Sequence, residues 1–134
     1  MELKSMMAVS ASALQAQSLR MRVIAENLAN VDSVAPEAGA DPYRRKVVQF
    51  KPVDVDGGGQ GVEVSRVDRD QSAFKRVLRP GSPAADAKGY VDLPNVNSAI
   101  EMADMQSAQR SYEANLSAIE AAKNLTMRTI DLLK

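Results

Sequence analysis

Few residues of this sequence have the chemistry that a catalytic or metal-binding site requires. The segment Asp54-Val55-Asp56-Gly57 begins like a calcium-binding loop, in which carboxylate oxygens at alternate positions surround the ion. The fifth position of such a loop would be Gly58, which has no side-chain oxygen, and the twelfth would be Ser65, where a carboxylate is required. The segment therefore predicts a turn rather than an ion site.

Other common catalytic groups are also missing. The chain of 134 residues contains no histidine and no cysteine, which excludes the commonest general base, thiol nucleophiles and two common zinc ligands. The glycine run at residues 57–61 lacks the Lys-Ser or Lys-Thr pair that follows a phosphate-binding loop. We therefore expect a protein that is not an enzyme and that binds no metal, no cofactor and no small-molecule substrate.

The distribution of charge argues against two further classes of partner. The 17 basic and 17 acidic residues cancel, and no segment has the charge of one sign that binding to nucleic acid or to an anionic membrane would require. The one basic cluster, Arg44-Arg45-Lys46, is expected to form a solvated strand edge. The chain has no apolar stretch of about 20 residues that could insert into a membrane. Its N-terminal apolar run is too short for a cleavable signal peptide.

Apolar residues at both ends of the chain follow helical spacing. Within about residues 5–31 and again within about residues 97–133, they recur at intervals of three, four or seven. Such spacing places each set on one face of an α-helix. We expect Ser5 to cap the first helix, and Asn95 or Asn97 to cap the second.

The second helix is too long for a compact globule of this size. At 1.5 Å per residue it would extend over about 55 Å, whereas a compact domain of this length would be about 36 Å across. No proline or glycine lies between residues 95 and 134 to interrupt it. We therefore predict a mainly α, elongated fold in which long N- and C-terminal helices pack as a coiled-coil-like pair.

The intervening sequence predicts a small irregular or β insertion. Residues 43–50 form a predicted strand between Pro42 and Pro52, and the glycine run forms a turn before valines in near alternation at positions 62, 64 and 67. These strands are too few for an independent core. We therefore divide the chain into a discontinuous terminal-helix domain (residues 1–31 and 96–134) and an extended loop or β-hairpin insertion (residues 32–95).

Two groups of motifs point to a family. The first is Ile24-Ala25-Glu26-Asn27-Leu28-Ala29-Asn30-Val31, and the second comprises residues 89–97, 101–105 and 110–115, with Pro42-Tyr43-Arg44-Arg45 between them. The first resembles the Asn-Leu-Ala-Asn signature near the start of bacterial flagellar axial proteins, the rod and hook family. The second resembles the segment that leads into the final helix of the proximal-rod members of that family.

The resemblance implies a structural subunit of the proximal rod of the flagellar basal body. Such a subunit would assemble through its terminal helices into a helical tube that transmits torque and encloses the export channel. Its partners would be copies of itself, other rod proteins, a FliE-type basal-body protein and the flagellar export apparatus. It would lie in the periplasm, exported without cleavage of a signal peptide.

The candidate interaction residues are the apolar side chains of the two helical stripes and the asparagines near the end of the first helix. Stripes that one molecule leaves uncovered favour packing against copies and relatives, and a contact that does not close gives an open helical assembly. The candidates are Leu14, Met21, Ile24, Asn27, Leu28, Asn30, Met105, Tyr112, Leu116, Ile119, Ile130 and Leu133.

Three alternatives remain open on the sequence alone. The stripes could pack against each other within one molecule, and Asn30 could simply end the first helix in a left-handed conformation. The chain could also be a soluble helical adaptor that forms a closed dimer or bundle with its partners. A closed dimer would leave no stripe free for further copies, which distinguishes it from a rod subunit.

Overall fold

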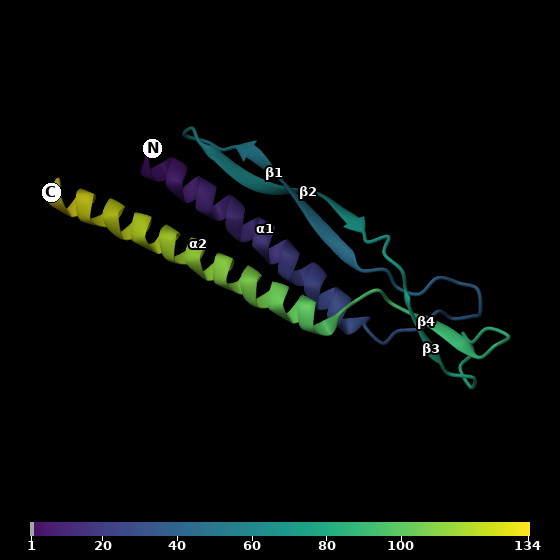
Figure 1. Ribbon diagram of the computed structural model, residues 1–134. Coiled ribbons are helices and arrows are strands. Elements are labelled where there is room, and N and C mark those ends of the chain that lie inside the picture. Colours follow the sequence, from purple (N-terminus) through teal and green to yellow (C-terminus); the bar gives the residue numbers. More distant parts are fainter. Residues whose placement is uncertain (1) are drawn as a thin grey trace.

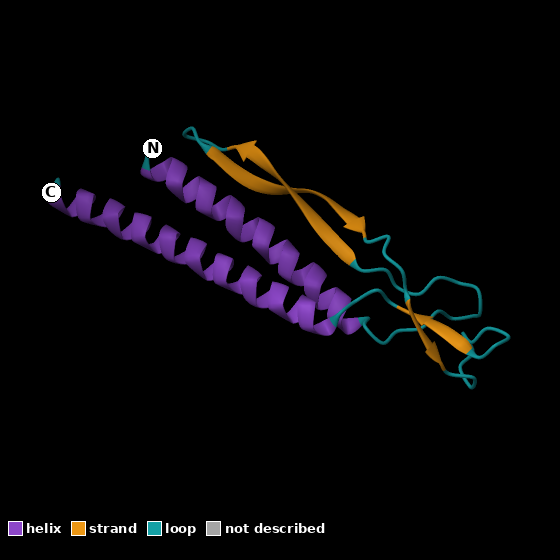
Figure 2. Cartoon of the chain, viewed as in Figure 1, coloured by secondary structure: helices purple, strands orange, loops and turns teal. Residues whose placement is uncertain are grey.

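The computed structural model describes residues 2–134, which form two helices and two β-hairpins (Figures 1 and 2). Helix α1 spans Leu3–Ala29 and helix α2 spans Ser98–Leu132. Strands β1 (Lys46–Asp54) and β2 (Gln60–Arg69) form one antiparallel pair, and β3 (Lys75–Leu78) and β4 (Tyr90–Leu93) form the other. The predicted arrangement of two terminal helices around a small β insertion is confirmed.

Helix α1 occupies the centre of the molecule. Figure 1 shows it between α2, which runs antiparallel to it, and the β1–β2 hairpin, and contacts join α1 to both. Helix α2 has 35 residues against 27 in α1, which corresponds to lengths of about 52 and 40 Å. The C-terminal end of α2 therefore extends beyond the start of α1 (Figure 1).

Small side chains allow the close packing around α1. Its buried positions include Ser5, Ser10 and Ala16, and those of α2 include Ala108 and Ala122. Serine and alanine bury little apolar surface but let backbones approach closely. Neither helix within residues 2–134 combines the length and apolarity needed to cross a membrane.

The helix ends differ in part from the sequence-based expectation. The predicted cap at Asn97 is confirmed, since its side chain accepts hydrogen bonds from the amides of Ala99 and Ile100 at 3.0 and 3.3 Å. The predicted cap at Ser5 is wrong, because α1 begins at Leu3 after Glu2. The Ser5 hydroxyl instead donates a hydrogen bond to the carbonyl of Gly58.

The left-handed alternative for Asn30 is also wrong. Its backbone has φ −107° and ψ 9°, which lies outside the left-handed region. Its side-chain amide donates to the carbonyl of Glu26 at 2.9 Å, one turn earlier in the same helix. Asn30 therefore ends α1 by satisfying a backbone acceptor that would otherwise lack a partner.

The bounds of the strands differ from the prediction, and β1 begins at Lys46 rather than at Tyr43. Strand β1 continues through Pro52 to Asp54, whereas Pro52 was expected to lie beyond its end. The strand can include Pro52 because it pairs only with β2 and leaves its other edge free. Strand β4 was not predicted, although the alternation of buried Val91 and Leu93 with exposed neighbours indicates it.

The turn of the β1–β2 hairpin packs on the start of α1. The amide of Val62 donates to the Ser12 hydroxyl at 3.1 Å, and that hydroxyl donates to the carbonyl of Val9 at 2.7 Å. A Cβ atom at Gly61 would lie 2.3 Å from Ser12 Oγ and 2.8 Å from Val55 Cγ1. The glycine run therefore has two roles, because it turns the chain and also allows the hairpin to contact α1.

We predict that Gly61→Ala destabilises the protein by about 1–3 kcal/mol, because the added methyl group overpacks the contact with Ser12. The measurement is the free energy of unfolding in urea, together with amide exchange of β1 and β2. Gly81→Ala is the matched control, since a Cβ there would meet no atom within 4 Å. Equal stability of the two variants would contradict the proposed close contact.

Candidate protein-interaction site

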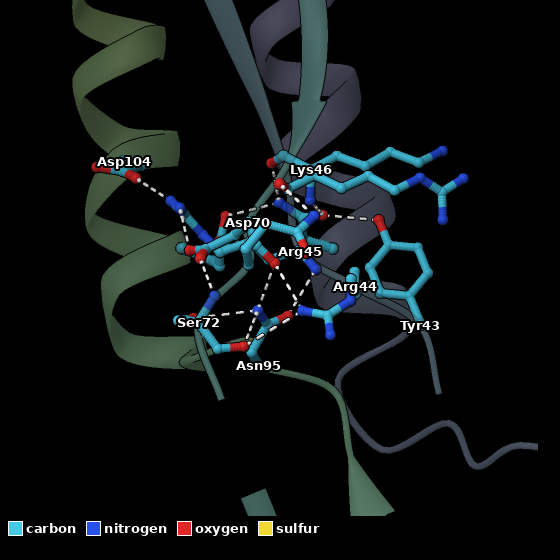
Figure 3. Close-up of polar contacts among 12 residues, drawn as sticks. Tyr43, Arg44, Arg45, Lys46, Asp70, Ser72, Asn95 and Asp104 are labelled. Atoms are coloured by element: carbon cyan, nitrogen blue, oxygen red, sulfur yellow. Dashed lines mark hydrogen bonds and ion pairs between the residues drawn. The ribbon is translucent and has the colours of Figure 1, made fainter. Parts of the chain in front are cut away.

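A cluster of polar side chains joins the end of α1, the start of β1 and the start of α2 (Figure 3). We call this cluster the polar junction. It comprises Asn27, Tyr43, Arg45, Lys46, Asp70, Asn95, Glu101 and Asp104. The junction brings the two terminal segments of the chain together at one place, although 74 residues separate Asn27 from Glu101.

Asn27 is fully buried, and both ends of its side-chain amide are bonded. Its oxygen accepts from the Tyr43 hydroxyl at 2.7 Å and from the amide of Lys46 at 2.9 Å. Its nitrogen donates to the carbonyl of Lys46 at 2.9 Å and to Glu101 Oε2 at 3.3 Å. This one side chain therefore holds β1 and α2 against α1.

Glu101 is also fully buried, and its charge is paired with Arg45. The Arg45 Nε–H donates to Glu101 Oε1, while Nη2 lies 3.4 Å from Asp104 Oδ2 and Nη1 lies 3.6 Å from Asp70 Oδ2. Burial alone would lower the pKa of Arg45, but its hydrogen bond to Glu101 and the neighbouring carboxylates raise the pKa overall. The arginine therefore stays charged in the junction.

The prediction of a solvated basic edge at residues 44–46 is wrong. The Arg45 side chain is only 22% exposed, and Lys46 Nζ lies 2.6 Å from Glu26 Oε1. Arg44 stacks on Phe74, with its guanidinium carbon 4.2 Å from the ring centre. All three residues contact groups from other segments, because this part of the chain lies against the end of α1 and the Arg45 side chain reaches the start of α2.

The polar junction extends to the connections before β3 and before α2. The Asn95 side chain accepts from the amide of Arg45 at 2.8 Å and donates to the carbonyl of Asp70 at 2.9 Å (Figure 3). Hydrogen bonds from the backbone and side chain of Ser72 hold the pKa of Asp70 below its usual value, aided by Arg45 and opposed by burial. Both connections are thereby fixed relative to the helices.

The buried polar groups of the junction are all bonded within the molecule. No buried side-chain nitrogen or oxygen within residues 2–134 lacks a hydrogen-bond partner. In the same part of the chain, no group of three or more acidic side chains could hold a metal ion. The junction fixes the positions of the two helices and the β1–β2 hairpin relative to one another.

The twelve candidate interaction residues fall into three classes of burial. Two are buried inside the molecule, Ile24 and Asn27. Seven are half-buried along the packed helices, namely Leu14, Met21, Leu28, Asn30, Met105, Tyr112 and Ile119. Three are exposed, namely Leu116 at 40%, Ile130 at 47% and Leu133 at 82%.

Sequence reasoning missed several residues of the polar junction and several exposed apolar residues of α2. Tyr43, Arg45 and Glu101 lie within segments of family resemblance, but their role in the junction depends on contacts across the fold. On α2 the buried residues Glu101, Ala108 and Ala122 are separated by seven and fourteen positions and so lie on one line of the helix. Because small or paired residues occupy this line, larger apolar residues remain exposed beside it, namely Ile100, Met102, Leu125, Met127 and Leu132.

We predict that Asn27→Ala destabilises the protein by about 2–4 kcal/mol, because it leaves the Lys46 backbone and the Glu101 carboxylate without a buried partner. The measurement is the denaturant midpoint of the purified chain. Asn30→Ala is the control, since that side chain is half-buried and bonds only within its own helix. Similar losses in both variants would show that Asn27 does not hold the junction.

A second prediction concerns alkaline pH. Burial, followed by the charges of Glu26 and Glu101, raises the pKa of Tyr43 to about 12. The pKa of Tyr43 in the folded protein lies above the unfolded value of about 10. The contribution of the Tyr43 hydroxyl to folding stability is therefore complete below pH 10 and is lost between about pH 10 and 12. The stability difference between the natural chain and Tyr43→Phe should therefore shrink over this interval. A constant difference in unfolding free energy would contradict this assignment.

Comparisons with known proteins find family models that match the two terminal segments of the chain. Residues 7–35 match the family model of the flagella basal body rod protein, and residues 87–132 match that of the flagellar basal body rod FlgEFG protein C-terminal region. These two matches contain Asn27 and Glu101, respectively, so each family region contributes one fully buried polar residue to the junction.

Relatives extend the similarity over nearly the whole chain. The flagellar basal-body rod protein FlgC of Agrobacterium fabrum is 47% identical, covering 94% of this chain and 91% of that protein. The FlgC proteins of Escherichia coli O157:H7 and Bacillus subtilis are 44% and 40% identical, over 98% and 94% of this chain and 98% and 95% of their own lengths. The chain therefore belongs to the family of flagellar basal-body rod proteins.

Proposed function

We propose that the chain is a structural subunit of the proximal rod of the flagellar basal body, and that its terminal helices mediate assembly with copies of itself and with other rod proteins. The observation that carries this proposal is the unpartnered surface of α2. Among the helices and strands, α2 packs against α1 alone. Most of its circumference is therefore free to contact other molecules.

The free surface of α2 is rich in large apolar side chains. Seven of them on α2 are at least 40% exposed, namely Ile100, Met102, Leu116, Leu125, Met127, Ile130 and Leu132, and the exposed Leu133 follows directly after the helix. Burial of apolar surface stabilises an interface by about 25 cal/mol per Å². These side chains lie on more than one side of the helix, which favours contacts with several neighbours over a single closed dimer.

The proposal includes the overall geometry of assembly. An elongated, coiled-coil-like pair of helices (residues 1–31 and 96–134) would form the wall of a helical tube around the export channel, with the insertion of residues 32–95 facing outward. A helix about 52 Å long is stiff along its axis. The polar junction fixes the insertion to the two helices. This connection supports transmission of torque between the helices and the insertion.

The remaining partners and the location follow from the same proposal. A proximal-rod subunit lies in the periplasm and contacts a FliE-type protein at the base of the rod. It reaches this place through the flagellar export apparatus without cleavage of a signal peptide. The family resemblance supports these assignments, and the role is structural rather than enzymatic.

The test is incorporation of variants with a charge on the free surface of α2. We predict that Leu116→Asp and Leu133→Asp each reduce the amount of this chain in isolated basal bodies at least tenfold and impair motility. Both side chains are exposed, so the substitutions place no charge in the core of the monomer. Ser117→Asp is the matched control, because it adds the same charge beside Leu116 at an exposed position that carries no apolar group.

Two outcomes would contradict the proposal. Full rods and normal motility with both leucine variants would show that the chain does not assemble through the free surface of α2. A stable closed dimer of the purified chain that never associates with basal bodies would instead favour the adaptor. The candidate residues Leu28 and Ile119 are unsuitable for this test, because they are half-buried in the monomer and a charge there would also disturb folding.

A further inference from the structure

We infer that Asp56 converts spontaneously to isoaspartate in the folded protein, which makes the turn between β1 and β2 a substrate for an isoaspartyl methyltransferase. In this turn Asp56 is followed directly by Gly57. Nowhere else in the chain does a glycine follow an aspartate or an asparagine. The inference concerns the single chain, so it goes beyond the proposed assembly and does not depend on it.

The reaction joins the side chain of Asp56 to the backbone of Gly57. The Gly57 amide nitrogen attacks Cγ of the protonated carboxyl group, and the carboxyl hydroxyl leaves with the amide proton as one molecule of water. The five-membered imide then takes up one water and opens at either carbonyl. Opening at Cγ restores aspartate, whereas opening at the backbone carbonyl gives isoaspartate, in which the chain continues through Cβ and Cγ.

The attacking nitrogen is accessible in the folded chain. Asp56 and Gly57 are both exposed, and glycine has no side chain to hinder the approach. Two neighbouring amides of the turn are bonded, since Val55 donates to the Gly59 carbonyl and Gly58 to the Val55 carbonyl, each at 3.2 Å. The amide of Gly57 has no hydrogen-bond acceptor within residues 2–134. No internal bond therefore has to break before this nitrogen reacts.

A second aspartate shows how the fold can prevent the same reaction. Asp32 is exposed and precedes the small residue Ser33, which is also a favourable sequence for imide formation in a flexible peptide. In the folded chain the Ser33 amide donates to the carbonyl of Asn30 at 3.1 Å, and the Ser33 hydroxyl donates to the same oxygen at 2.9 Å. These bonds hold the Ser33 nitrogen in the turn that follows α1, so folding should protect Asp32.

An asparagine beside a small residue is held in a similar way. Asparagine forms the same imide with loss of ammonia instead of water, and Asn97 precedes Ser98. The Asn97 side-chain oxygen caps α2 by accepting from the amides of Ala99 and Ile100 at 3.0 and 3.3 Å. These bonds fix the side chain at the start of the helix, so we expect folding to protect Asn97 as well.

Isoaspartate at position 56 would disrupt the contact between the hairpin turn and α1. It adds one carbon to the backbone directly before Gly57, which shifts the following residues by about 1.5 Å. A Cβ at Gly57 would lie 3.4 Å from the backbone nitrogen of Ser5, so this part of the turn already touches the start of α1 (Figure 1). The buried Ser5 hydroxyl donates to the Gly58 carbonyl. The shift would remove this bond and leave the hydroxyl without a partner.

Ageing of the purified full chain tests the site. The folded chain and a chain unfolded in guanidinium are kept at neutral pH for several weeks, and isoaspartate at each position is measured by peptide mapping. We expect folding to change the rate at Asp56 less than threefold, whereas folding lowers the rate at Asp32 at least tenfold. Equal protection of Asp56 and Asp32 by folding, or no isoaspartate at Asp56 in the folded chain, overturns the inference.

Two exposed substitutions serve as matched controls. Asp56→Glu keeps the charge but requires a six-membered ring, so isoaspartate-type product at this position should fall at least tenfold. Asp56→Asn keeps the shape of the side chain and replaces water with ammonia as the leaving group, so the rate should rise at least tenfold. Unchanged rates in both variants would show that this side chain does not take part in the reaction.

The structural consequence has its own measurement. In the aged chain that contains isoaspartate, hydrogen exchange of the Val55 and Gly58 amides should be at least tenfold faster than in the fresh chain. An isoaspartyl methyltransferase transfers a methyl group from S-adenosylmethionine to the new α-carboxylate, methanol leaves as the imide closes again, and repeated cycles restore aspartate and slow exchange. Ser5→Ala should reproduce the fast exchange without ageing. Slow exchange in the isoaspartate form would overturn the predicted loss of contact.

Discussion

Glu101 places a carboxylate where water cannot reach it, and the rest of the fold is arranged around that group. A buried carboxylate is tolerated only when a cation and hydrogen-bond donors compensate for its lost hydration. Arg45 supplies the charge and Asn27 supplies a donor. These three residues come from the start of α2, the segment before β1 and the end of α1. The compensation therefore exists only when three distant segments meet in one arrangement.

Such a network contributes more to uniqueness than to net stability. The charge–charge attraction of a buried pair is largely offset by the cost of removing both groups from water, but separating the pair leaves an uncompensated charge. In this chain the apolar interior contains few large residues, since Ala16, Ala108 and Ala122 are among its buried positions. Interchangeable small apolar contacts would permit α1 and α2 to slide past each other. The junction fixes their register.

The sequence indicated the secondary structure more completely than it indicated the contacts between distant segments. Helical spacing predicted both long helices, and the glycine run predicted the hairpin turn, because these are local properties of the chain. The junction could not be derived in this way. Arg45 stands among charged neighbours that favour a solvated edge, and only its contacts with Glu101 and Asp104 of α2 and with Asp70 bury it. Similarly, Ser5 suits a helix cap, but contact with Gly58 gives its hydroxyl another role.

The stripe on α2 was predicted, but its division between internal and external packing was not. Spacing alone cannot distinguish the side of a helix that faces its own molecule from a side about 80° away. The position of Glu101 decides this, because it directs the line of Ala108 and Ala122 toward α1 and leaves Leu116 and Met127 exposed. On α2, small residues and the paired Glu101 thus face α1, whereas large apolar residues remain exposed. The proposed assembly would bury these exposed side chains between molecules, and the junction fixes the helix faces that carry them within the single chain.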